Sequence, residues 1–323
     1  MIESGGALSR ATRRVFLPLL AEGSVLVGGQ AVIEGVLMRL PKTYAVAVRD
    51  PKGDVQVKKE RLLETARGRF GNLPVVRGSV ILFKSLMLGI SALNYSAEVA
   101  MAEELKEGEK PAAASTWSLV LTVALSLALG VLLFFYLPLV ATQFISTRWT
   151  LAQNSIGFNL VDGALRVAVF LVYILGISLA KDIRRVFAYH GAEHKVVFTW
   201  EAEEDLTVEN ARRHVRLHPR CGTSFLLFVM VVSILVFSLV PHSFPFWAKA
   251  LARIVFLPLI AGISYELIRF TAKFPKSPWV RPLLWPGLAF QLLTTREPDD
   301  SMLEVALKAL SEARDLDAEA AAA

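Results

Sequence analysis

Two histidines and a glutamate within one short segment have the spacing of a metal-binding motif. His190, Glu193 and His194 form the pattern H-x-x-E-H. On a helix, this spacing places two imidazoles one turn apart on the same face with a carboxylate beside them. The same spacing occurs in the inverted zincins, which bind a catalytic zinc ion. Two ligands alone do not hold a metal ion, so the motif needs further ligands elsewhere in the chain.

A second pair of candidate ligands lies downstream of this motif. His218 is followed three positions later by Cys221, the only cysteine among 323 residues. A lone cysteine cannot form an intramolecular disulfide, which leaves packing, metal ligation or thiolate chemistry in a reducing compartment. Neutral imidazole and thiolate are ligands that zinc prefers, and four of them complete a tetrahedron. We therefore predict a zinc site built from His190, His194, His218 and Cys221.

The number of ligands decides what such a site could do. If all four residues bind the metal, the site is closed and structural. If Cys221 or one histidine stays off the metal, a position is open for water, and Glu193 is placed to take the proton of that water. The sequence leaves both alternatives open.

A run of basic residues surrounds the second pair. We expect these arginines to contact anionic lipid headgroups; RNA is the weaker alternative because aromatic residues are not interleaved, and DNA binding is not expected. His214 shares a helical face with His218, but its basic neighbours favour a solvated position over metal ligation. The run comprises Arg212, Arg213, Arg216 and Arg220.

The composition indicates a membrane protein. Hydrophobic residues make up 54% of the chain and charged residues 20%, which excludes an ordinary cytosolic enzyme, a disulfide-built secreted protein and a disordered chain. Asp162 and Arg166 lie four residues apart in one apolar stretch and can pair on one helix face. Arg253 and Glu266 lie near the ends of another, where we expect them to extend toward the interface. The four stretches long enough to cross a bilayer are residues 117–140, 160–180, 223–240 and 250–268.

The distribution of basic residues predicts the topology. The segments outside the four spans carry 16, 1, 8, 1 and 7 Lys or Arg residues in chain order, which places both termini and the loop 181–222 in the cytoplasm. A fifth span at residues 78–97 would put that loop on the wrong side. We therefore predict an interfacial or re-entrant amphipathic helix there, with Arg77 and Lys84 on its polar side. Residues 283–293 are too short to cross, and we expect them at the membrane surface.

Short β-strands are predicted before the first span. Residues 43–49 and 55–59 alternate around the turn-forming residues 50–54, which indicates a hairpin. Residues 25–38 are consistent with a further strand whose glycines mark bends or a close backbone approach.

At the other end of the chain, residues from 301 onward have helical periodicity and then an alanine-rich tail that we expect to be frayed. The predicted fold is thus an α-helical polytopic membrane protein of about four transmembrane helices with a small N-terminal β-containing cytosolic domain. Its predicted parts are the β-rich segment 1–72, the interfacial helix and linker 73–116, spans at 117–180, the metal-site loop 181–222, spans at 223–268 and the cytosolic segment 269–323.

Four sequence blocks carry a resemblance to a known family. GGQAVIEGVLMR (28–39), YHGAEHK (189–195), LTVEN (206–210) and RLHPRCGTSF (216–225) resemble the signature blocks of the YqhQ-like membrane family, domain of unknown function 1385, from about residue 28 to about residue 296. The resemblance implies a protein of the bacterial cytoplasmic membrane and a predicted metal-dependent enzyme. It places the function on His190, Glu193, His194, His218 and Cys221, and extends the functional surface to Gln30, Glu34 and Arg39.

Three functions remain as hypotheses. The first is a membrane protein with a cytosolic-face zinc site that hydrolyses a substrate, with Glu193 and Glu34 as candidate catalytic carboxylates; Glu34 could equally be a further ligand or an ordinary sheet-edge carboxylate. The second is a non-enzymatic factor in membrane-protein biogenesis or ribosome contact, with a protein or ribosomal partner and a structural zinc. The third, a transporter, is the weakest, because few ionisable residues lie deep within the predicted spans.

Overall fold

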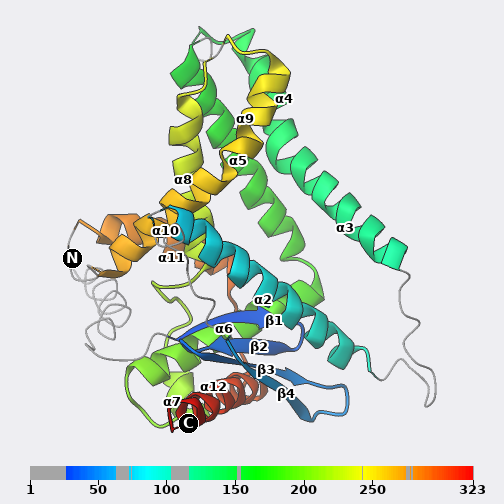
Figure 1. Ribbon diagram of the computed structural model, residues 1–323, viewed down its shortest axis with the longest axis vertical. Helices are drawn as coiled ribbons and strands as arrows, with labels where there is room; N and C mark the ends of the chain where they lie inside the picture. The colour runs from blue at the N-terminus through cyan, green and yellow to red at the C-terminus, as the bar shows by residue number, and fades with distance from the viewer. Residues whose placement is uncertain are drawn as a thin grey trace, which may run out of the picture.

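A computed structural model describes residues 27–62, 73, 75–102, 116–150, 154–241, 243–273, 277 and 279–322. Long helices extend from one end of the molecule, and a small sheet with its covering helices forms the other end (Figure 1). Of the predicted parts, residues 1–26 and 63–72 of the β-rich segment and the linker at 103–115 lie outside the described residues.

The sheet consists of four antiparallel strands in the order β1-β2-β3-β4. The predicted hairpin is confirmed as the pair β3 and β4, in which Arg49 lies opposite Val55. The single strand predicted over 25–38 is wrong, because this segment forms the two strands β1 and β2. They are joined by a tight turn at Ile33 and Glu34, and Glu34 has a φ of 50° there. The strands span Gly28–Val32, Gly35–Arg39, Thr43–Arg49 and Val55–Arg61.

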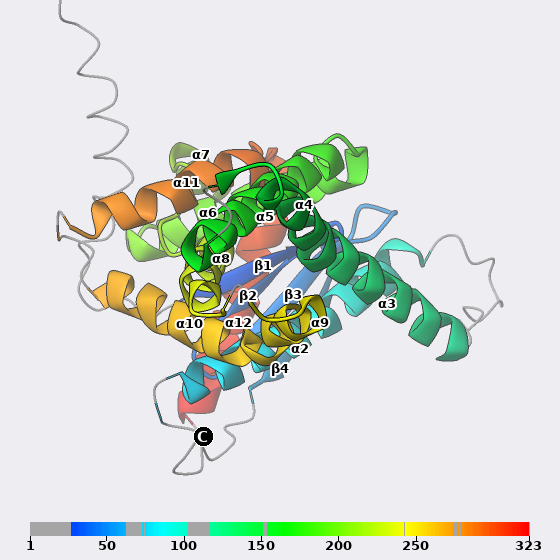
Figure 2. The ribbon, with the colours of Figure 1, turned by 90° about the horizontal axis from the view of Figure 1, so that it is seen from above.

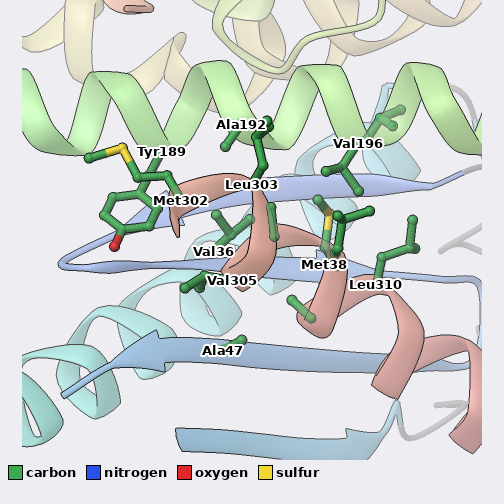
Figure 3. Close-up of a cluster of buried hydrophobic side chains, with 14 of the residues drawn as sticks. Val36, Met38, Ala47, Tyr189, Ala192, Val196, Met302, Leu303, Val305 and Leu310 are labelled. Carbon is green, nitrogen blue, oxygen red and sulfur yellow. The ribbon is translucent and has the colours of Figure 1, made fainter. Parts of the chain in front are cut away.

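One face of the sheet is covered by α6 (Lys181–Glu201) and α12 (Asp300–Ala322). Alternate strand residues such as Val36 and Met38 point to this face, where Figure 3 shows Tyr189, Ala192 and Leu303 among the buried side chains. The short helix α7 (Val208–Arg213) lies at the same end of the molecule, and Thr207 caps it by accepting a hydrogen bond from the Asn210 backbone N–H.

The C-terminal periodic residues belong to this core. Leu303, Ala306, Leu307 and Leu310 are all buried, so the predicted helix is confirmed. The expected frayed tail is corrected, since α12 is helical to Ala322.

The other face of the sheet is covered by α2 (Val76–Ala100). Ala92, Leu88 and Tyr95 of α2 pack against buried strand residues such as Leu37 and Val46. The opposite side of α2 exposes large apolar side chains at helical spacing, and Figures 1 and 2 show the helix running beneath the long apolar helices. The exposed set includes Val76, Val80, Phe83, Leu86, Met87, Ile90 and Leu93.

Among the described residues, three helices are long and apolar enough to cross a membrane: Val76–Ala100, Ala124–Ser146 and Ser155–Ile177. The second of these runs through α3 (Thr116–Val131), a π-helical turn (Leu132–Tyr136) and α4 (Leu137–Ser146), and the third is α5.

A fourth span is obtained if α9 (Phe246–Val255) and α10 (Leu257–Lys273), which meet at an angle of 45°, count as one. The apolar helix α8 (Thr223–Ser238) is shorter, and α11 (Arg281–Thr294) packs against it. The protein is thus a mostly helical, multi-pass membrane protein with a small antiparallel sheet.

The charged residues singled out in the predicted spans form ion pairs within the protein. Arg166 donates to Asp162 at 2.9 Å, which confirms the predicted pair. Arg253 was expected to extend toward the interface, but it is 2% exposed and donates to the same Asp162 oxygen at 2.9 Å. Glu266 instead pairs with Arg77 of α2.

Candidate metal centre

The motif residues lie on α6, in the part of the protein that carries the sheet. His190 and His194 are one turn apart, and both are buried with Cys221, which lies just before α8. Each of the three residues offers one ligand atom, and these atoms lie within 4.8 Å of one another. The three side chains could therefore hold a metal ion together.

Backbone carbonyl groups fix the orientation of both imidazoles. His190 Nδ1 lies 2.8 Å from the Thr294 carbonyl oxygen, and His194 Nδ1 lies 2.5 Å from that of Arg216. Because a carbonyl oxygen only accepts, each Nδ1 must carry the proton, and each Nε2 of a neutral ring then has a free lone pair. Such outer hydrogen bonds are typical of metal-binding histidines.

The Nε2 atoms point to the remaining ligand. His190 Nε2 lies 3.2 Å from Cys221 Sγ. His194 Nε2 is buried and has no hydrogen-bond partner within the described part of the chain. A buried nitrogen without a partner costs about 1–3 kcal/mol, and two imidazoles with a thiolate are a donor set that zinc accepts. The residues present therefore fit a metal ion.

The electrostatics of the cluster favour a pairing of the Cys221 thiolate with a protonated His190, which would release its Nε2 proton on binding a metal. Burial alone would raise the pKa of Cys221, but the charges of His194 and His190 hold it well below its usual range. Burial would likewise lower the pKa of His190, yet the Cys221 thiolate raises it to about 9. The Thr223 backbone N–H and hydroxyl lie 3.4 Å and 3.1 Å from Sγ. Cys221 is therefore prepared as a thiolate, the form that binds metals.

Glycines on two elements allow the close packing around the motif. A Cβ atom at Gly191 would lie 2.1 Å from the Arg296 carbonyl oxygen, so only glycine lets the chain after α11 cross α6 and bring Thr294 to His190. A Cβ atom at Gly29 of β1 would lie 2.8 Å from the Glu193 side chain. The expected close backbone approach at this glycine is confirmed, and its partner is the motif glutamate.

Glu193 is buried, and burial raises the pKa of its carboxyl group. Among the described residues it forms no ion pair, although it lies on the helix that carries both histidines. Its side chain lines a cavity of about 460 Å³ together with His194 and Cys221. The cavity is enclosed by the edge of the sheet, α2, α6, α10 and the turn before α8. Its other polar lining residues are Gln30, Arg39, Ser85, His218, Arg220 and Tyr265.

His218, the fourth predicted ligand, lies nearby but is not part of the three-residue group. Its ring centre is 5.7 Å from that of His194. Its Nδ1 accepts the Arg220 backbone N–H at 3.3 Å, and its Nε2 lies 3.3 Å from Glu201. Burial lowers the pKa of His218. Gln291 of α11 holds its backbone through two hydrogen bonds of 2.8 Å.

Glu34 lies apart from this cluster. Both of its carboxylate oxygens accept from Arg185 at 2.5 Å, and Tyr189 donates to it at 3.4 Å. Glu34 is neither in the ligand group nor among the residues that line the cavity. Gln30 and Arg39, the other two residues of the first sequence block, do line it.

The basic run is engaged within the protein. Arg212 pairs with Asp300, Arg213 with Glu209 and Arg220 with Glu201. The Arg216 guanidinium donates to the Thr295 carbonyl oxygen at 3.2 Å, and His214 pairs with Glu204 at 3.0 Å. Arg212 and Arg213 nevertheless remain largely exposed, so contact of this run with lipid headgroups stays a prediction.

Several residues that build the site gave no signal in the sequence. The carbonyl groups of Thr294 and Arg216 orient the histidines, and any residue type supplies a carbonyl. Gln291 and Glu201 act from other helices. Only Gly28 and Gly29, the two glycines before Gln30, indicated in the sequence that the backbone of β1 passes close to another element.

Comparisons with known proteins agree with the four sequence blocks. The family described as "Protein of unknown function (DUF1385)" matches residues 73–316. The chain is 33% identical over 299 residues to "Uncharacterized protein YqhQ" of Bacillus subtilis (strain 168), which covers 90% of this chain and 93% of that protein. No solved structure matches. The chain thus belongs to the DUF1385 family, as its sequence blocks and the extent of these matches require.

Proposed function

We propose that the protein is a zinc-dependent hydrolase at the cytoplasmic face of the membrane, with His190, His194 and Cys221 as its zinc ligands. One observation carries this proposal: two of the three ligand residues, His194 and Cys221, line the same cavity as Glu193, and the third, His190, lies behind them with its Nε2 3.2 Å from Cys221 Sγ. A closed structural site has no need of an adjoining cavity of about 460 Å³.

The roles of the chain's own residues follow from their positions. A zinc ion with three protein ligands would supply Lewis acidity and make water acidic near neutral pH. Glu193 would accept the proton of that water, since its buried carboxylate faces the cavity without an ion-pair partner among the described residues. The Thr294 and Arg216 carbonyl groups would keep both imidazoles in the ligating orientation.

A structural zinc in a biogenesis factor is the second candidate, and one observation favours it. The ligands join α6 to the turn before α8, and His190 is tied to α11 through Thr294. A metal ion there would fasten three helices, and its loss would loosen the cytosolic part. In that case His218 would complete the site by giving up its bond to Glu201.

The two candidates respond differently to substitution of Glu193. Glu193→Gln keeps shape and hydrogen bonding but removes the base. We expect this variant to retain its metal and its fold. It should nevertheless fail to complement cells that lack the gene, and this failure should be as complete as that of His194→Ala. The matched control is His214→Ala, which removes a histidine bound to Glu204 outside the cluster and should complement normally.

His218→Ala separates the three-ligand site from the four-ligand site. The hydrolase proposal expects this variant to keep its zinc, whereas a closed four-ligand site would lose it. Full complementation by metal-loaded Glu193→Gln would end the hydrolase proposal in favour of the structural zinc.

A further inference from the structure

The cavity beside the candidate metal centre is also lined by Arg39, at the end of the cavity formed by the sheet and α2. This residue ends β2, is partly buried and points to the α2 side of the sheet with Leu37. Its guanidinium donates to Ser85 Oγ of α2 at 3.4 Å, which is a long and weak hydrogen bond. Within the described part of the chain, Arg39 has no carboxylate partner. Most of its five donors are therefore free to bind a ligand.

The other arginines near the cavity are already neutralised. Arg220 lines the cavity as well, but it is paired with the buried Glu201. Arg77, on the same helix as Ser85, binds Glu266 through two donors at 2.7 Å and 2.5 Å. Arg39 is thus an uncompensated cation in a partly desolvated place, and burial lowers its pKa. A guanidinium in such a place is stabilised by a bidentate anion.

The side chains around Arg39 are hydrogen-bond donors. Ser85, Tyr265 and Gln30 line the same cavity and offer two hydroxyl groups and an amide N–H₂. The Gln30 side chain is held against α2, because a Cβ atom at Gly89 would lie 2.4 Å from its Oε1. A fork of charged donors with further neutral donors around it suits a phosphate, which has three acceptor oxygens, better than a carboxylate, which has two.

We propose that Arg39, Ser85, Gln30 and Tyr265 form an oxoanion site, and that the ligand of this cavity carries a phosphate group. The phosphate would lie at the sheet edge against Arg39, and the bond to be cleaved would lie at the Glu193 end of the same cavity. The second half of this statement rests on the proposed hydrolase function, whereas binding of the phosphate at Arg39 does not.

The phosphate could belong to a lipid headgroup or to a soluble compound. The cavity is lined by α2 and α10, and both helices carry exposed apolar side chains such as Phe83 and Phe270. A ligand with an acyl chain could therefore leave the cavity along an apolar surface. The recognition chemistry at Arg39 is the same for either source.

The test is binding of inorganic phosphate to the purified full chain in a non-ionic detergent, measured by titration calorimetry. We expect Arg39→Gln to bind phosphate at least about tenfold more weakly, because a charge-assisted bidentate contact is lost. Arg39→Lys keeps the charge and the fold but not the fork, and should weaken binding by a smaller factor. The matched control is Arg61→Gln, an exposed arginine on the outer strand of the same sheet, which should bind as the wild type does.

Two further measurements make the assignment specific. Acetate in place of phosphate should bind at least about tenfold more weakly to the wild type, since a carboxylate fills fewer of the donors. Vesicles of phosphatidylcholine with and without phosphatidic acid distinguish the sources: Arg39-dependent binding to phosphatidic acid tighter than to inorganic phosphate supports a lipid ligand, and equal affinities support a soluble one. Phosphate binding that is unchanged in both Arg39 variants, or equal affinity for acetate, would overturn the proposal.

The phosphate-binding experiment can succeed or fail independently of the hydrolase proposal. His194→Ala should lose metal but keep Arg39-dependent phosphate binding. If the protein holds no zinc and Arg39 still governs phosphate binding, the oxoanion site stands and the hydrolase proposal falls.

Discussion

Substituting Gly29 tests whether the sheet edge positions Glu193. An alanine Cβ at this position would lie 2.8 Å from Cγ and Cδ of Glu193 and 2.8 Å from the Leu37 carbonyl oxygen. The side chain can move, but the carbonyl belongs to the neighbouring strand and cannot move without disturbing the pairing of β1 with β2. Crowding of this kind lowers the free energy of unfolding by about 1–3 kcal/mol.

The adjacent residue supplies a matched control. A Cβ atom at Gly28 would meet nothing within 4 Å. Replacing a glycine in an unstrained position stabilises a protein by about 0.4–1 kcal/mol through the unfolded state. Gly28→Ala should therefore be neutral or slightly stabilising, although it changes the same residue type in the same strand.

The assay is thermal unfolding in detergent followed by the fluorescence of the six tryptophans. At about 2–4 °C per kcal/mol, Gly29→Ala should lower Tm by about 2–12 °C relative to the wild type. It should also displace Glu193 and so reduce complementation while the metal content stays unchanged. Equal melting temperatures of Gly28→Ala and Gly29→Ala would refute the close approach between β1 and Glu193.

Two other predictions concern the apolar helices. Asp162→Asn removes the carboxylate shared by the buried Arg166 and Arg253. This change should lower the free energy of unfolding by about 3–5 kcal/mol, which would be measured as a lower Tm in detergent. The control Asp182→Asn, at an exposed site, should change Tm little. Equal melting temperatures of Asp162→Asn and Asp182→Asn would show that the ion pairs of Asp162 do not stabilise the helix bundle. The second prediction concerns topology and uses a Cys221→Ser background. Arg148→Cys and Trp247→Cys should react with an impermeant thiol reagent from outside the cell, whereas Asp205→Cys should react only after the membrane is opened. Labelling of Asp205→Cys from outside would contradict the predicted topology.

Local patterns predicted those parts of the fold that depend on neighbouring residues. Alternation over residues 43–49 and 55–59 identified the β3–β4 hairpin, and apolar stretches identified two of the long helices, Ala124–Ser146 and Ser155–Ile177. The third, Val76–Ala100, is long enough to span although we expected an interfacial or re-entrant helix there, and the helix at the span expected over 223–240 is shorter than a span. The segment 25–38 was misassigned because two five-residue strands joined at Ile33 and Glu34 leave almost no turn between them. The helical periodicity after residue 301 was visible, but its partner was not. Thr43 donates to the Ala313 carbonyl oxygen across 270 positions of sequence.

The candidate site likewise contains some residues that local patterns predicted and others that only the folded chain brings together. The helical spacing of His190 and His194 predicted their common face, and the spacing of His218 and Cys221 indicated a second ligand pair, of which only Cys221 lies in the three-residue group. The position of His218 depends on Glu201 and on Gln291 of another helix, which no local pattern reveals. The oxoanion residues come from β1, β2, α2 and α10, so only the folded chain brings them together.

The most direct test of the account is the metal content of the purified protein, combined with X-ray absorption at the zinc edge. We predict about one zinc per chain, with one sulfur and two imidazole nitrogens among its ligands. His194→Ala and Cys221→Ser should both lose the metal and unfold at lower temperature, because ligand binding energy contributes to folding at such a site. His214→Ala should remain fully loaded. Unchanged zinc content in both His194→Ala and Cys221→Ser would contradict the assignment of the metal to these residues.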